Sequence, residues 1–385
     1  MGVDVDDPAS IKQENAATLR RERITRFMVV LGSLQGYIGL ILIVAYGILS
    51  KGDIFWNGTN LTNAVGAFSS RGILAVGETL VILIAGIDLS VGSMLGFCSM
   101  TAALLLTTRN MNPVEIVIIS MLVGAGFGFL NGAATARLRI QSFIVTLAML
   151  SIVRGLDREL SNNVSVGTQV VTANGHLTPS SEAFQSLGTP GHNLFTFSLP
   201  GAGQVGIYYP VLAFLVVCII FQFVLARTSF GRHIYAVGGN ETAARLSGVN
   251  VTLIKIAVFT LAGLLAGFAG PIDAAYSASA DPLAGQSFEL DAIAAAVIGG
   301  ASLAGGKGTI IGTLVGALIL TLLDNVLGLN AVSDNWQLVI KGLIVVIAVV
   351  LQRPGIFSAL FSSVRSIGSR VRPERRGANN SERVM

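Results

Sequence analysis

Charged residues are scarce in this sequence. Asp, Glu, Lys and Arg make up 12% of its 385 residues, about half of the roughly 25% in a soluble domain, and 52% are hydrophobic. With a mean hydropathy of +0.72, the chain has too few charges to cover a surface that faces water on all sides. The composition therefore excludes a soluble enzyme, a disordered regulator and a nucleic-acid-binding protein. It predicts a polytopic membrane protein in contact with lipid.

Side chains that bind metals or form disulfides are equally rare. The two cysteines lie in apolar runs, where a free thiol behaves as a small hydrophobe, and the three histidines are scattered over polar or basic segments. No CxxC or HxxxH pair occurs, so we expect neither a metal site nor a cofactor in this chain. The residues concerned are Cys98, Cys218, His176, His192 and His233.

Two glycine-rich stretches imitate nucleotide-binding loops without meeting their requirements. Residues 201–206 match GxGxxG, but they follow no predicted buried strand. Residues 301–308 resemble a phosphate loop, but Ala301 stands at the first glycine and Gly308 at the Ser or Thr that would bind magnesium. No ATP site is therefore predicted in this chain.

Ten apolar runs predict transmembrane helices. A spanning helix needs about 20 mostly apolar residues, and only helices or closed barrels satisfy their backbone in lipid. The runs are continuous rather than alternating, which favours helices and an all-α fold. Several are too short to cross straight, so broken or re-entrant helices are expected among them. The clear runs are 27–49, 113–134, 207–226, 251–274, 309–329 and 337–352, and shorter or glycine-broken runs lie at 63–86, 91–107, 142–156 and 290–304.

The basic residues orient these helices, because loops rich in Lys and Arg stay on the cytoplasmic side. With the N-terminus inside, most of the 25 Lys and Arg residues fall in cytoplasmic segments. This predicts cytoplasmic tails at 1–26 and 353–385 around a transmembrane domain at 27–352. A polar loop at 157–206 then lies outside, either to contact an external partner or as a passive connector, and a loop at 231–250 lies inside.

The loop at 231–250 contains a short, bounded helix. Asn240 is a favourable N-cap, and Glu241 lies in the first turn, where the helix dipole favours an acid. Gly248 is positioned as the residue that ends the helix. About two turns of helix are unstable alone in water, so we expect something to pack against it.

The side chains of this short helix leave two interpretations open. Ala243, Ala244 and Leu246 offer an apolar face, and Arg245 is able to pair with a carboxylate of another protein. The helix is then either an ordinary connector that rests on lipid headgroups or a coupling helix that fits a cleft in a separate ATPase subunit.

Four segments together resemble one family. The run GETLVILIAGIDLSVGS at 77–93, the run SFIVTL at 142–147 with its later Arg154-Gly155, the run FELDAIAAAVIGG at 288–300 with GGKG at 305–308, and the loop at 231–251 occur in the family's order. They resemble the sugar-type permeases of bacterial ABC importers, the group that includes the ribose permease. The resemblance covers residues from about 61 to 350.

This resemblance implies a permease subunit that imports a monosaccharide, a ribose-like pentose or a hexose, across the bacterial inner membrane. It implies three partners: a cytoplasmic ATPase subunit that holds ATP and Mg, a periplasmic sugar-binding protein, and a second permease copy in a homodimer or heterodimer. The second to fifth and seventh to tenth helices would form two halves of opposite orientation. No residue-level repeat is visible in the sequence.

Polar residues inside the spans are candidates for the substrate pathway. Glu78 lies seven positions after Arg71 on one helix and is either a paired structural carboxylate or part of the route. An uncharged sugar needs weak hydrogen bonds, for which hydroxyl and amide groups are suited. The pathway candidates are Glu78, Ser142, Thr146 and Asn325, and a helix-turn motif, in which Asp88 is expected to cap the third helix, comprises Asp88, Ser90 and Gly92.

Other classes of membrane protein fit less well. An ion-driven secondary transporter would need a connected set of buried acids, and Glu78 stands nearly alone in the sequence. A membrane enzyme would need a metal or nucleophile cluster. An ABC permease for a polyol, a sugar-derived autoinducer or a nucleoside remains an alternative substrate assignment.

Overall fold

The computed structural model describes residues 36–188 and 194–351. A helix covers Gly36–Phe55. The elements that follow are α2 (Gly58–Leu83), α3 (Val91–Arg109), α4 (Pro113–Arg137), α5 (Ser142–Ser161), β1 (Val166–Gly167), α6 (Pro179–Ser186), β2 (Phe195–Leu199), β3 (Gly203–Ile207), α7 (Tyr209–Arg227), α8 (Ser229–Gly239), α9 (Glu241–Leu246), α10 (Val251–Tyr276), β4 (Ser279–Ala280), α11 (Phe288–Ile298), α12 (Ile310–Leu329) and α13 (Asp334–Leu351).

The all-α prediction is confirmed, and each predicted apolar run overlaps one of these helices. In the described ranges, seven helices are long and apolar enough to cross a membrane: the Gly36–Phe55 helix, α2, α3, α4, α7, α10 and α12. The 11 residues of α11 extend only about 16 Å, half of a hydrocarbon core of roughly 30 Å. The total of ten spans therefore stays a prediction. Residues 27–35 of the first run and the tails at 1–26 and 353–385 lie outside the described residues.

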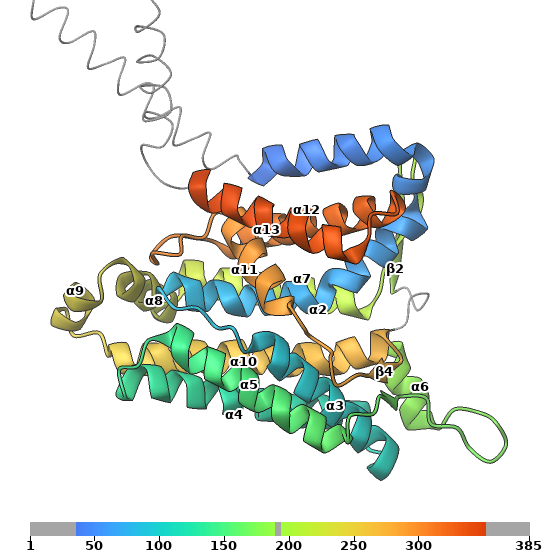
Figure 1. Cartoon of the computed structure of the whole chain (residues 1–385), viewed down its shortest axis with the longest axis horizontal. Coiled ribbons are helices and arrows are strands. Elements are labelled where there is room, and N and C mark those ends of the chain that lie inside the picture. The colour runs from blue at the N-terminus through green and yellow to red at the C-terminus, as the bar shows by residue number, and fades with distance from the viewer. Residues whose placement is uncertain (1–35, 189–193, 352–385) are drawn as a thin grey trace, which may run out of the picture.

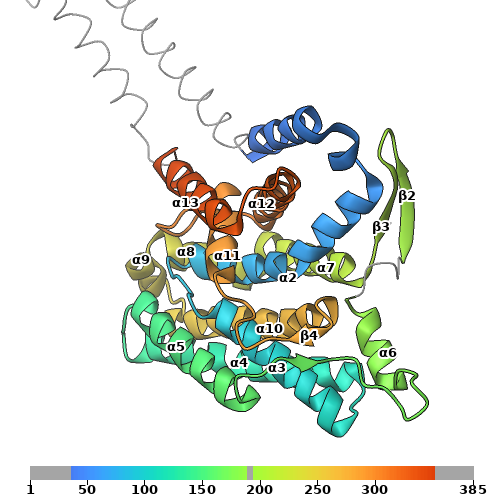
Figure 2. The same cartoon turned by 45° about the vertical axis from the view of Figure 1, so that its right-hand side comes forward.

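The helices form a bundle with two distinct ends. α8 and α9 lie together at one end, and β2, β3 and α6 lie at the opposite end (Figure 1 and Figure 2). We call these the α9 end and the α6 end. α2 runs from the α6 end to the α9 end, and α10 runs back in the opposite direction (Figure 1).

Two groups of helices, α2–α5 and α10–α13, repeat one arrangement. In each group a helix of 26 residues, α2 or α10, is followed by a segment without regular helix and then by a shorter helix, α3 or α11. These segments, at 84–90 and 277–287, lead back into the bundle (Figure 1). Because α2 and α10 run in opposite directions, the two groups are oriented as inverted halves.

The two segments also share a residue pattern. Asp88 and Asp281 each accept a hydrogen bond at 2.8 Å from the backbone N–H two residues later. Four residues after each aspartate stands a glycine, and a Cβ on either Gly92 or Gly285 would collide with the carbonyl oxygen of the other. The sequence analysis found no residue-level repeat, but this Asp-x-x-x-Gly spacing is one.

Close packing between α4 and α10 depends on glycine. A Cβ at Gly124 or Gly263 would collide with the backbone of the other helix, and one at Gly128 would collide with the carbonyl of Phe259. Small residues let backbones approach each other where lipid offers no hydrophobic drive for association. The GxxxG steps in these helices therefore serve packing within the chain.

The region predicted as an external loop at 157–206 carries structure of its own. α5 continues to Ser161 because its charged last turn still forms helical hydrogen bonds. β1 then pairs with β4, and β2 pairs with β3 in an antiparallel hairpin. Gly201 and Gly203 have φ of +76° and +82° in the hairpin turn, so the GxGxxG match serves this turn and the strand after it.

Candidate functional site

The short helix α9 is capped at both ends. Asn240 Oδ1 accepts the N–H of Ala243 at 2.9 Å, which is the predicted N-cap bond. At the other end Gly248 has φ +85°, and its N–H and that of the next residue donate to carbonyls of the last turn at 3.0 and 3.1 Å. These two bonds form a Schellman motif. The predicted helix is confirmed, with Glu241–Leu246 as its extent.

The expected single apolar face of α9 is not present. Ala244 is 5% exposed and packs on the bundle, whereas Leu246 is 85% exposed and Ala243 is also exposed. The reason is helical geometry, because residues three apart share a face and Ala244 is turned away from that face. α9 therefore presents Ala243 and Leu246 outward.

Ion pairs tie α9 to itself and to α10. Glu241 Oε1 accepts from Arg245 at 2.8 Å, and Glu241 Oε2 accepts from the Lys255 ammonium at 2.7 Å. The hydrogen bond from Lys255, with a further contribution from Arg245, lowers the pKa of the Glu241 carboxyl below its usual value. Arg245 thus has a carboxylate partner within this chain, whereas the sequence suggested one in another protein.

α8, which the sequence analysis did not predict, connects α9 to the bundle. The Tyr235 hydroxyl donates to the Gly308 carbonyl at 2.7 Å. The Gly306 N–H donates to the Leu83 carbonyl at 2.9 Å, and Gly238 packs against that same carbonyl with no room for a side chain. α8 is therefore held against the end of α2 and the 302–309 turn. The Gly306 N–H, which a phosphate loop would direct at its ligand, is thus used for a bond within the chain.

A cavity of about 850 Å³ lies beside α9. The end of α4, the starts of α5 and α10, and α9 line it, with Ile84 and Phe259 among its apolar walls. Its charged lining residues are mostly basic: Arg137, Arg139, Arg245, Lys255 and Glu241. We call it the α9-end cavity.

Four fully buried polar residues form what we call the Asp88 cluster: Glu78, Asp88, Ser90 and Asn131. Glu78 Oε1 accepts the Asp88 N–H at 3.1 Å, Asp88 accepts from Ser90, and Asn131 Nδ2 donates to Ser90 Oγ at 2.9 Å. Asp88 bonds to the turn itself rather than to the first turn of α3, so the expected helix cap is wrong. The Asp88 side chain is short, and it accepts the backbone N–H of Ser90, two residues later, before it can reach the helix.

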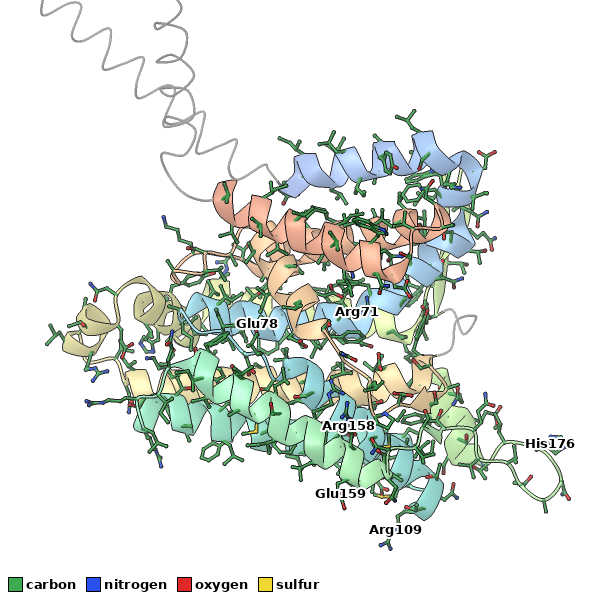
Figure 3. The ribbon with its side chains drawn as sticks, in the orientation of Figure 1. Arg71, Glu78, Arg109, Arg158, Glu159 and His176 are labelled. Atoms are coloured by element: carbon green, nitrogen blue, oxygen red, sulfur yellow. The ribbon has the colours of Figure 1, made fainter. Side chains whose placement is uncertain are left out.

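Glu78 does not pair with Arg71. Both lie on α2, with Glu78 closer to the α9 end (Figure 3), and Glu78 accepts its hydrogen bond from the Asp88 backbone N–H. Seven residues span about 10 Å of helix, which is too far for a direct contact along one face.

Ser142 and Thr146 hold the same segment from the side of α5. Ser142 Oγ accepts the Ile87 N–H at 3.2 Å, and Thr146 Oγ1 donates to the Ile87 carbonyl at 3.2 Å. Three of the four pathway candidates thus fix the segment at 84–90. Asn325 lies elsewhere.

A second polar group connects four helices. We call it the charge network: Arg71 of α2, Asp291 of α11, Asp324 of α12 and Lys341 of α13. Arg71 lies 3.4 Å from each aspartate, and Lys341 Nζ lies 3.2 Å from Asp291 and 2.9 Å from Asp324. The Arg71 guanidinium also lies 4.3 Å from the ring centre of Phe288, within cation–π range.

The charge network borders a cavity of about 590 Å³ in the half of the bundle toward the α6 end. We call it the α6-end cavity. Asn325 lines it and forms a reciprocal amide pair with Asn60 at 2.8 and 2.9 Å. Its other polar lining residues are Asn63, Arg71, Tyr276, Thr321, Asp324, Asp334, Gln337 and Lys341.

Sequence reasoning missed the charge network. It treated Glu78 as the nearly isolated acid of the interior, yet Asp291 and Asp324 are joined through two cations. The available signal was that all four members, two acids and two bases, lie inside predicted spans, where an ionisable residue needs a partner.

Arg154 also has a role that the sequence did not indicate. It lies 3.8 Å from its neighbour Asp157. Its stronger bonds go to the carbonyls of Ala284 at 2.6 Å and Pro282 at 3.1 Å. Arg154 therefore fastens α5 to the segment at 277–287, as Ser142 and Thr146 fasten it to 84–90.

Comparison with known proteins assigns this arrangement to a family. Residues 60–349 match the family described as the permease component of branched-chain amino acid transport systems. The chain belongs to this permease family. It is a multi-pass membrane protein and a transport subunit rather than an enzyme.

Curated relatives of this permease are named for sugars. It is 42% identical over 313 residues to the ribose import permease of Escherichia coli strain K12, which covers 81% of this chain and 90% of that protein. It is 39% identical over 326 residues to the ribose import permease of Bacillus subtilis, with 84% and 94% covered. The xylose transport system permease of Haemophilus influenzae is 37% identical, with 82% and 96% covered. No solved structure matches the chain.

These relatives confirm the predicted resemblance to sugar-type permeases. The family's description names another solute class, whereas the relatives named above are ribose and xylose permeases. Within residues 36–188 and 194–351, no group of three His, Cys, Asp or Glu side chains is arranged to hold a metal ion.

Proposed function

We propose that this permease is the membrane subunit of an ATP-driven ABC importer that carries a monosaccharide, a ribose-like pentose or a hexose, into the cytoplasm. The ribose and xylose relatives support the substrate class. The observation that carries the ATP-driven part is α9, a six-residue helix fixed at both caps with Leu246 85% exposed. A leucine held outward on so short a helix is suited to a cleft in another subunit.

In this proposal α9 docks into a separate ATPase subunit, which holds ATP and Mg. Asn240 and Gly248 fix the ends of the helix, and Ala243 and Leu246 enter the cleft. Arg245 is exposed enough to exchange its partner for a carboxylate of the ATPase.

Movement of α9 then reaches the bundle along two routes. The Glu241–Lys255 pair and buried Ala244 carry it to α10. α8 carries it to the end of α2 and to the 302–309 turn, through Tyr235 and Gly238. Because α2 and α10 begin the two inverted halves, such a movement would tilt one half against the other.

The α9 end faces the cytoplasm in this proposal, with both termini on that side of a bacterial inner membrane. The basic lining of the α9-end cavity fits the rule that positive charge is retained inside. The α6 end, with the segment at 157–206, then faces a periplasmic sugar-binding protein. A second permease copy, identical or a sibling, completes the translocating pair.

The sugar route in this proposal begins at the α6-end cavity, with Asn325 on its wall. Glu78, Ser142 and Thr146 serve the route by holding the segment at 84–90 in place. Asp88, Ser90 and Gly92 form the turn that lets α3 start inside the bundle.

The test is uptake by the complete transporter in proteoliposomes, with its ATPase and binding protein. We expect uptake of a labelled monosaccharide to require ATP hydrolysis and to be insensitive to an uncoupler. Uptake that continues without hydrolysis but stops with the uncoupler would instead identify an ion-coupled transporter. Uptake of a polyol or nucleoside but no monosaccharide would keep the ABC assignment and reject the substrate class.

A further inference from the structure

The α6-end cavity has unused hydrogen-bonding capacity at its charged wall. Asp324 Oδ1 and Arg71 Nε are buried side-chain atoms without a hydrogen-bond partner in the described part of the chain. Both residues line the cavity. A ligand in the cavity can reach the exposed parts of these two side chains, because Arg71 is 29% and Asp324 is 23% exposed.

The charge balance of the cavity argues against an anion as the preferred ligand. Its charged lining residues are two cations, Arg71 and Lys341, and two anions, Asp324 and Asp334. The two cations are already engaged with aspartates at 2.9–3.4 Å. Asp291, which pairs with both cations from outside the lining, makes the aspartates outnumber the cations, so no free positive charge remains to hold an anion. Strong donors and acceptors that are already paired suit an uncharged molecule that carries several hydroxyl groups.

Size and lining agree with a small polyhydroxylated ring. The volume of about 590 Å³ lies within the roughly 300–1,000 Å³ of small-molecule sites. Amides of Asn63, Asn325 and Gln337 supply further polar groups, and Phe68 and Tyr276 supply rings on which the C–H face of a sugar can pack.

The position of the site supports the same ligand. Asp291 lies in the first turn of α11, the short helix that starts inside the bundle after the segment at 277–287. In transporters built from inverted repeats, substrate sites lie where such interrupted helices begin. The charge network joins that helix start to α2, α12 and α13 at the border of the cavity.

We propose that the α6-end cavity is a monosaccharide subsite, in which Asp324 accepts from one sugar hydroxyl and Arg71 donates to a second. The sugar class rests on the proposed function, whereas the presence of a neutral polyhydroxyl site rests on the cavity. The network charges stay paired with each other while the sugar is bound. Binding is therefore weak, in the millimolar range or about −4 kcal/mol, which allows the sugar to leave.

The test measures binding to the full permease in nanodiscs, without ATPase or binding protein. Ala67 is exposed and lines the cavity, so Ala67→Cys provides a thiol there, while the native Cys98 and Cys218 are buried. A charged, membrane-impermeant thiol reagent modifies the new cysteine, and ribose, xylose, fructose and allose are tested for protection up to about 50 mM, well above a millimolar Kd. Ser198→Cys, exposed on β2 and outside the cavity, is the matched control.

At least one of the monosaccharides is expected to slow modification of Ala67→Cys but not of Ser198→Cys. Adding Asp324→Asn should raise the half-protecting concentration about tenfold or more, as expected for a lost charged hydrogen bond. Asp157→Asn, a buried aspartate outside the cavity, should leave it unchanged. Absence of protection by every sugar, or equal protection by glycerol, would overturn the subsite, even if Asp324→Asn itself failed to fold.

The subsite and the proposed function fail in different ways. ATP-driven uptake of a monosaccharide that gives no protection would reject the subsite and keep the importer. Protection by a monosaccharide together with uptake that needs no ATP would keep the subsite and reject the importer.

Discussion

Two groups of ion pairs in this permease differ in burial. From this difference we infer that one group can exchange partners and that the other is fixed. The more exposed group at the α9 end consists of Glu241, Arg245 and Lys255, whose side chains are 42%, 56% and 19% exposed. The charge network is formed by side chains that are 10–29% exposed. Solvent screens the first group, so its members can change partners at little cost. The second group loses solvation and is held together by its own pairing.

If the proposed function holds, the same contrast distinguishes the region that binds sugar from the region that couples to the ATPase. A fixed network of balanced charges can line a route without attracting ions, whereas exchangeable pairs suit a helix that another subunit engages and releases. We therefore expect substitutions in the network to act mainly on stability. Substitutions at α9 should act mainly on transport.

Removal of one network cation should have the largest effect on stability. Lys341→Met leaves Asp324 and Asp291 with Arg71 alone, and we expect a loss of about 3 kcal/mol, as for other broken buried pairs. The measurement is thermal unfolding of the purified permease in detergent. The double variant Lys341→Met with Asp324→Leu removes both partners and should recover more than half of the loss. A double variant as unstable as the single one would show that the pairing is not what stabilises these helices.

Substitutions in the Asp88 cluster should cause a smaller loss of stability, because they break a hydrogen bond and no ion pair. Glu78→Ala leaves the buried Asp88 N–H without an acceptor, which costs about 2 kcal/mol. Glu78→Gln keeps an oxygen at that position and should cost less than half as much in the same unfolding assay. Equal losses in both variants would mean that the charge of Glu78, rather than its hydrogen bond, matters.

The exposed pair should contribute least. Lys255→Met removes one partner of Glu241, and we expect a stability loss below about 1 kcal/mol because Glu241 stays partly in water. Raising the salt concentration should narrow the difference between native and variant protein. A loss as large as that of Lys341→Met would contradict the contrast between the two groups.

The pH dependence of α9 follows from the lowered pKa of Glu241. Its folded pKa lies below that of the unfolded chain, so its stabilising contribution is present above the usual value of about 4.3 and is lost as the pH falls through the folded pKa. Unfolding temperatures of the native protein and of Glu241→Gln should therefore differ near neutral pH and converge in acid. A gap that widened toward acid pH would have the wrong sign.

Local rules predicted the parts of this permease that depend on neighbours in sequence. Asn240, Glu241 and Gly248 indicated α9 correctly because caps and helix ends are decided within a few residues. The inward orientation of the Ala244 side chain depends on the bundle residues against which it packs. The sequence analysis did not predict this orientation.

Sequence reasoning did not predict contacts between residues that lie far apart in the chain. Arg71 meets Asp324 from a position 253 residues away, and no local pattern selects that partner among the other acids. The Asp-x-x-x-Gly repeat was visible in the sequence, but its meaning depends on Gly92 and Gly285 meeting in space. Asn325 was identified from the sequence because an amide is conspicuous in an apolar run. The cavity that it lines was not predicted.

Coupling through α9 is the central claim, and one pair of variants tests it most directly. Gly248 and Gly175 are matched: both have φ near +80°, both have nothing within 4 Å of a Cβ, and the N–H of each bonds to the carbonyl three residues earlier. Proline cannot adopt this φ and lacks that N–H, so Gly248→Pro undoes the end of α9 and Gly175→Pro disturbs an equivalent turn outside it. We expect the complete transporter with Gly248→Pro to insert normally but to lose ATPase binding and ATP-driven monosaccharide uptake, while Gly175→Pro keeps ATPase binding. ATPase binding and uptake that both survive Gly248→Pro would contradict the account.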